Sequence, residues 1–93
     1  MIKHIVCHKL SDKTKAAQIT QMLSGLVGKV PSLKRMEAGV DFMEKPRSYD
    51  FGLVAEFDDR AGLDAYDVHP EHEKVRAIIR QYSVGSVSVD FEL

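Results

Sequence analysis

The sequence lacks most of the features that would place it outside the class of small globular domains. It has one cysteine, Cys7, which cannot form an internal disulfide, so a reducing compartment is indicated. It has no apolar run long enough to cross a bilayer, and no hydrophobic signal segment follows Met1. We therefore expect a cytoplasmic protein that does not bind a membrane.

The charges are balanced and give no sign of a polyanionic partner. The chain has thirteen basic and fourteen acidic residues, for a formal net charge of -1, and no block of basic residues stands out. Nucleic acid is therefore not an expected partner. The 93 residues form a single domain, 1–93, near the lower size at which a chain buries its own core, so a second copy would add to its stability.

The pattern of apolar residues predicts the fold class. Four segments alternate in the manner of strands: 2–9, 33–42, 50–57 and 84–92. Helical spacing predicts a helix over 12–27, and a second helix that begins near Arg60, stops before Pro70 and continues beyond it. The order βαββαβ predicts an α+β, ferredoxin-like fold, with one four-stranded antiparallel sheet and both helices on one side.

The alternation also divides the sheet residues between two faces. We expect the helices to cover the more apolar set: Ile5, Cys7, Met36, Ala38, Val40, Phe51, Leu53, Ala55, Phe57, Val87, Val89 and Phe91. The opposite face would then be mixed: His4, Val6, His8, Arg35, Glu37, Gly39, Gly52, Val54, Glu56, Ser86, Ser88 and Asp90. Such a face is either open to water or covered by the sheet of a second copy, with a small-ligand cavity between them. We favour the second arrangement, a homodimer through the sheet.

The stretch from Tyr66 to His72 is the part of the chain that most suggests chemistry. Pro70 interrupts the helix, and His69 would hold the bend through a side-chain hydrogen bond. His72, with an ordinary pKa of about 6.5, could act as a general base or could instead donate to a backbone carbonyl. Tyr66 could polarise a carbonyl with its hydroxyl. Because Pro70 breaks the spacing of the two histidines and no third ligand follows, we expect no metal site.

The first strand carries two further histidines, one on each side of the lone cysteine. His4 would lie on the cavity face, where Glu56 and Asp90 occupy cross-strand positions that could orient its ring. His8, near the end of the strand, would be exposed. Cys7 would face the core as an inert apolar group, because adjacent strand residues point to opposite faces.

Several motifs in this order resemble the stress-responsive dimeric α+β barrel (Dabb) family. They are Ile2-Lys3-His4-Ile5-Val6, the turn Leu26-Val27-Gly28-Lys29-Val30-Pro31, Arg47-Ser48-Tyr49-Asp50, and above all Tyr66-x-x-His69-Pro70-x-His72. The resemblance covers nearly the whole chain and implies ferredoxin-like homodimers whose sheets close into a barrel. Some members are described as stress-induced plant proteins. One is a polyketide cyclase that performs an aldol condensation without a cofactor.

The resemblance to that cyclase implies roles for three residues: His72 as general base, Tyr66 at the substrate carbonyl, and His4 as a pocket residue. We therefore expect a stress-responsive barrel that binds a small apolar or carbonyl-containing molecule and needs no cofactor. The expected binding residues are His4, Val6, Val54, Glu56 and Asp90. The alternative is a cyclase-like enzyme that uses His72 and Tyr66, and a third possibility is a cofactor-free monooxygenase of the related barrel type.

Overall fold

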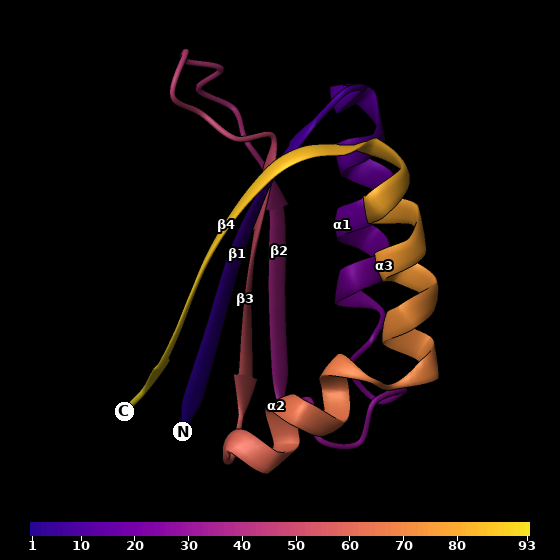
Figure 1. The fold of residues 1–93 in the computed structure, drawn as a ribbon, viewed down its shortest axis with the longest axis vertical. Helices are drawn as coiled ribbons and strands as arrows, with labels where there is room; N and C mark the ends of the chain where they lie inside the picture. Colours follow the sequence, from indigo (N-terminus) through magenta and orange to yellow (C-terminus); the bar gives the residue numbers. More distant parts are fainter.

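The computed structural model describes all residues, 1–93, and confirms the ferredoxin-like fold (Figure 1). Its elements are β1 (Ile2–Leu10), the 3-10 turn η1 (Lys13–Lys15), α1 (Ala16–Ser24), β2 (Arg35–Val40), β3 (Phe51–Phe57), α2 (Arg60–Asp67), α3 (Pro70–Tyr82) and β4 (Ser83–Glu92). The four strands pair antiparallel in the order β2-β3-β1-β4. No helix has the length and apolar character that crossing a bilayer requires.

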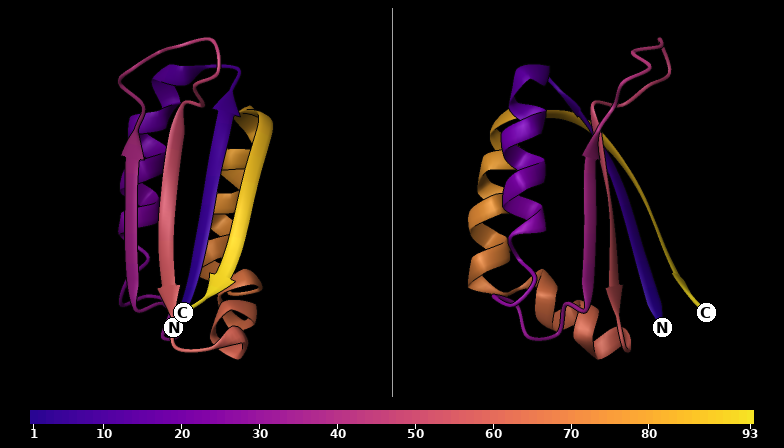
Figure 2. Two further views of the ribbon diagram at one scale, coloured as in Figure 1. Left: turned by 90° about the vertical axis from the view of Figure 1, so that its left-hand side faces the viewer. Right: turned by 180° about the vertical axis from the view of Figure 1, so that it is seen from behind.

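The helices all lie on one side of the sheet, which leaves the other side uncovered (Figure 2). In the left view of Figure 2, α1 lies behind β2 and β3, whereas α3 lies behind β1 and β4. The short helix α2 crosses the end of the sheet between β3 and α3. The apolar core therefore forms between one face of the sheet and the helices, with Leu23, Ala55 and Phe57 fully buried in it.

The first helix is shorter than the predicted range 12–27. Asp12 caps the turn η1 by accepting from the amide of Thr14, and α1 ends at Ser24. Gly25 follows as the C-cap, and a glycine interior to a helix would cost about 1 kcal/mol relative to alanine. Consecutive turns after Gly25 keep Leu26 buried in the core. The helical spacing of apolar residues therefore continues beyond the end of α1.

The interruption predicted at Pro70 is confirmed. Helix α2 ends at Asp67 and α3 begins at Pro70, where a missing amide hydrogen costs nothing because that group has no helical acceptor. The Nδ1 atom of His69 accepts from the amide of Glu71 at 3.1 Å. His69 therefore caps α3 and holds the bend, and Pro70 starts the helix that carries His72.

The predicted faces of β1 were wrong. His4 pairs with Ala55 and Val6 with Leu53, and residues paired in this way point to the same side of the sheet. Ala55 and Leu53 are buried beneath the helices, so His4 and Val6 also face the helices. Both alternating sets of β1 contain apolar residues, and the alternation alone does not show which set lies under a helix.

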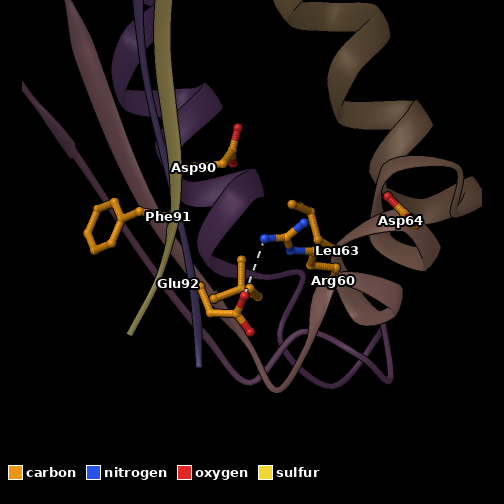
Figure 3. A pocket seen from close by; sticks show the side chains of 7 residues that line it. Arg60, Leu63, Asp64, Asp90, Phe91 and Glu92 are labelled. Atoms are coloured by element: carbon orange, nitrogen blue, oxygen red, sulfur yellow. Dashed lines mark ion pairs between the residues drawn. The ribbon is translucent and has the colours of Figure 1, made fainter.

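The predicted faces of β4 were inverted in the same way, whereas those of β2 and β3 were correct. Figure 3 shows Asp90 and Glu92 on the side of β4 toward α2 and Phe91 on the other side. We call the uncovered side the open face. Its centre is apolar and consists of Ile5, Cys7, Val54, Val87, Val89 and Phe91, and its margin carries Lys3, Arg35, Glu37 and Glu56.

Candidate functional site

A pocket of about 520 Å³ lies between α3 and the strands β1 and β4, on the covered side of the sheet. We call it the helix–sheet pocket. Its lining consists of His4, Val6, His8, Leu23, Leu53, Tyr66, Asp67, His72, Arg76, Ile79, Arg80, Ser83, Ser86 and Ser88. The structure thus brings His4, Tyr66 and His72 to one pocket, but this pocket lies within one chain. The predicted cavity between two sheets was the wrong location for these residues.

Tyr66 is the most unusual residue of the pocket. Only 1% of it is exposed, and its ring packs between His72, at a centroid distance of 4.0 Å, and Phe57, at 5.1 Å. Its hydroxyl is buried without any hydrogen-bond partner. Burial raises the pKa of Tyr66 to about 12, so the hydroxyl stays protonated near neutral pH. The pocket therefore contains a neutral donor that lacks an acceptor.

His72 lies beside Tyr66 with one ring nitrogen engaged and the other free. Its Nδ1 atom lies 3.3 Å from the carbonyl oxygen of Asp67 and 3.2 Å from Nη2 of Arg76. Nη2 has two hydrogens, and these already donate to the carbonyl oxygen and to the carboxylate of Asp67. Donation from Nδ1 to the Asp67 carbonyl is therefore the consistent assignment, and it leaves the lone pair on Nε2 without a partner.

The pKa of His72 is lowered from its ordinary value, first by burial and then by the guanidinium of Arg76. His72 is therefore neutral near pH 7, and a neutral imidazole with a free Nε2 can accept a proton. The backbone contact that was the alternative to a catalytic role is present, but it uses only Nδ1. The same contact fixes the tautomer that a general base requires.

His4 contacts Asp90 across the sheet, with Nδ1 of the ring against Oδ1 of the carboxylate. Its ring meets the edge of Tyr66 at a centroid distance of 6.2 Å. Glu56, the other predicted partner, lies on the open face and pairs with Lys3 at 3.2 Å. Val54 lies on the open face as well. Glu56 and Val54 are therefore not part of the pocket that contains His4 and Val6.

Several polar residues of the pocket were missed from the sequence, among them His8, Arg76 and Arg80. His8 was expected to be exposed, but it stacks on Phe51 at 5.2 Å and bonds the hydroxyl of Ser83 at 2.8 Å. Burial lowers the pKa of His8, so it too is neutral near pH 7. Arg76 and Arg80 follow His72 at intervals of four residues, and this spacing could have placed them on the same side of α3.

A second hollow, of about 410 Å³, lies where β4 approaches α2 (Figure 3). Most of its charged groups already have partners, since Arg60 pairs with Glu92 at 3.4 Å and Asp90 with His4; only Asp64 forms no ion pair. The helix–sheet pocket is the better candidate because it contains the unpaired hydroxyl of Tyr66. Nowhere in the chain do three histidine, cysteine, aspartate or glutamate side chains gather as metal ligands would.

Comparison with known proteins gives a family and several similar structures. Residues 2–93 match the stress responsive A/B barrel domain, Dabb. A dimeric ferredoxin-like protein of unknown function from Thermobifida fusca is 34% identical, with 99% of this chain and 90% of that chain covered and a TM-score of 0.86. A dimeric protein of unknown function from Bacteroides fragilis is 26% identical, with coverages of 99% and 95% and a TM-score of 0.89. An uncharacterised protein of Streptomyces coelicolor is 27% identical, with 99% of each chain covered.

Proposed function

Since the chain belongs to the stress responsive A/B barrel domain (Dabb) family, we propose that it binds a small carbonyl compound in the helix–sheet pocket, as a homodimer joined through the open face. The buried, unpaired hydroxyl of Tyr66 is the observation that carries this proposal. A buried hydroxyl without a partner costs about 1–3 kcal/mol, and a carbonyl oxygen is the kind of acceptor that offsets this cost.

The surroundings of Tyr66 fit a ligand that is partly hydrocarbon. Val6, Leu53 and Ile79 give the pocket apolar walls beside its polar residues. The hydroxyl of Tyr66 has no contact with bulk water in the structure, so a ligand reaches it only when neighbouring side chains shift. This arrangement would exclude water from the hydrogen bond once the ligand is bound.

The dimer is supported by the composition of the open face. Val87, Val89 and Phe91 are 49%, 53% and 40% exposed in the single chain, and they continue the apolar surface of Ile5. An apolar patch with a charged margin is typical of a protein–protein contact. The similar proteins from Thermobifida fusca and Bacteroides fragilis have the same fold and are both dimeric, which supports a dimer for this chain as well.

Titration calorimetry with a linear ten-carbon methyl ketone tests the binding proposal. We expect the ketone to bind the wild-type protein about fivefold more tightly than it binds Tyr66→Phe, because a single hydrogen bond of this kind contributes about 1 kcal/mol. Tyr49→Phe, in the loop before β3, is the matched control and keeps wild-type affinity. Equal affinity of wild type and Tyr66→Phe would contradict the proposal.

A second candidate function, proton abstraction, is favoured by the free Nε2 of His72. In this reaction Nε2 takes a proton from the carbon next to the ligand carbonyl, and the electrons of the broken C–H bond form an enolate. The hydroxyl of Tyr66 donates to the enolate oxygen, where negative charge develops. No cofactor is needed for this step, since the proton is the only species transferred.

Exchange of the ketone's α-hydrogens in heavy water, followed by proton NMR, tests this chemistry. His72→Gln removes the base and should slow protein-dependent exchange by about 10²- to 10⁴-fold. His69→Asn is the control, because it removes the other imidazole of this stretch while asparagine can still cap α3. Ketone binding without any protein-dependent exchange would leave the binding function in place and exclude the enzymatic one.

A further inference from the structure

We propose that the helix–sheet pocket contains an anion subsite at Arg80, and that its ligand carries a carboxylate at the end remote from the carbonyl. This inference rests on the proposed function and adds the chemical class of the ligand to it. The carbonyl would lie at Tyr66 and His72, near the beginning of α3, and the carboxylate near the end of α3.

The charges that line the pocket leave one cation without a counterion. Arg76 donates to Glu73 at 2.8 Å and to both the carboxylate and the backbone carbonyl of Asp67. Asp67 is the only acidic residue in the lining, and Arg76 already neutralises it. Arg80, one turn further along α3, is exposed at the pocket and forms no ion pair and no hydrogen bond within the chain. An anionic ligand would replace water as its partner.

The wall opposite Arg80 offers hydroxyl groups rather than further charge. Ser86 and Ser88 lie on β4 and line the pocket, and both are exposed, with no hydrogen bond within the chain, so their hydroxyls are free to bond a ligand. His8 pairs with Ser86 in the sheet and is neutral near pH 7, so it adds no charge of either sign. One guanidinium with nearby hydroxyls suits a monoanion such as a carboxylate better than a phosphate dianion.

The geometry separates this subsite from the carbonyl end. His72 and Arg80 are eight residues apart along α3, which corresponds to about 12 Å at 1.5 Å per residue. On the facing strand, His4 and His8 are four residues apart, or roughly 13 Å. The apolar residues Val6 and Ile79 occupy the middle of the pocket. A chain of about eight to ten carbons between ketone and carboxylate would span this distance.

Three matched probes test the inference by titration calorimetry. They are a linear twelve-carbon keto acid whose ketone lies next to the terminal methyl group, with nine carbons between ketone and carboxylate, its methyl ester, and the ten-carbon methyl ketone, which lacks the acid. We expect wild-type protein to bind the acid about tenfold more tightly than the ester, because a charge-assisted bond to guanidinium exceeds a neutral one. Arg80→Gln should abolish this preference and leave ester affinity unchanged.

Arg47→Gln is the control, since it removes the same charge from the loop before β3, outside the pocket. Arg80→Lys should keep only part of the preference, because lysine retains the charge but loses the guanidinium fork. The inference is overturned if acid and ester bind equally, or if Arg80→Gln and Arg47→Gln reduce acid binding alike. In either case the proposed carbonyl function survives provided that the ketone still binds in a Tyr66-dependent way. Failure of all three probes to bind contradicts both proposals.

Discussion

The two faces of the sheet are built from the same strands but have different surroundings. On β1, His4 and Val6 point under the helices into the pocket, whereas Ile5 and Cys7 point to the open face. The covered side holds the apolar core beneath the helices, but along β1 and β4 it also carries histidines and serines around the pocket. The uncovered side is apolar at its centre. This distribution on β1 and β4 is the basis for the proposals that a second chain covers the open face and that a ligand occupies the pocket.

The largest expected effect comes from placing a charge on the open face. Val89→Asp should dissociate the proposed dimer, because the two-fold axis brings two uncompensated carboxylates into the interface at a cost of several kcal/mol. Ser88→Asp, the adjacent residue on the covered face, should leave the dimer intact. Light scattering coupled to size-exclusion chromatography gives the mass of both variants. A dimeric Val89→Asp protein would show that the subunits associate elsewhere.

A smaller effect, a gain rather than a loss of stability, is expected from a change on the covered face. Tyr66→Phe should raise the free energy of unfolding by about 1 kcal/mol, since it removes a buried hydroxyl that has no partner. Urea unfolding of the ligand-free protein measures this change, with Tyr49→Phe as the control. A loss of stability would mean that the hydroxyl has a partner in solution, such as a buried water. Tyr66 would then be a satisfied core residue.

The smallest effect is on the pH dependence of stability. The folded-state pKa values of His8 and His72 lie below the ordinary value of 6.5, so the unfolded chain binds more protons between the lowered and the ordinary values. The free energy of unfolding should therefore fall as the pH drops below 6.5 and should level off above it. In urea unfolding, the variants His8→Gln and His72→Gln should each lose part of this decrease. An unchanged slope in both would contradict the burial of the two rings.

Much of the fold could be predicted because local signals agreed with one another. Pro70 and the preceding histidine marked the break between α2 and α3, and the alternation of β2 and β3 assigned their faces correctly. The faces of β1 and β4 could not be predicted in this way. In β4 the apolar set, Val87 with Val89, faces away from the helices. Periodicity shows that a strand has two different faces, but not whether a helix or a second chain covers the apolar one.

The candidate site was predictable in part. The sequence identified His4, Tyr66, His72 and Val6, which the structure brings to one pocket, although within a single chain. Arg80 was not predicted, because charges at helical spacing usually lie on a solvated face. Its relevance depends on β4 lying opposite the end of α3, which is a tertiary arrangement rather than a local pattern.

Methyl NMR of the protein during titration with the ten-carbon methyl ketone tests the central claim most directly. Val6 and Ile5 are neighbours on β1; Val6 faces the pocket and Ile5 the open face. Leu53 on β3 also faces the pocket, and Val89 on β4 also faces the open side. We predict that the methyl resonances of Val6 and Leu53 shift and show contacts with the ketone, while those of Ile5 and Val89 do not. Ligand contacts at Ile5 and Val89 instead would place the binding site between two sheets and would contradict the account.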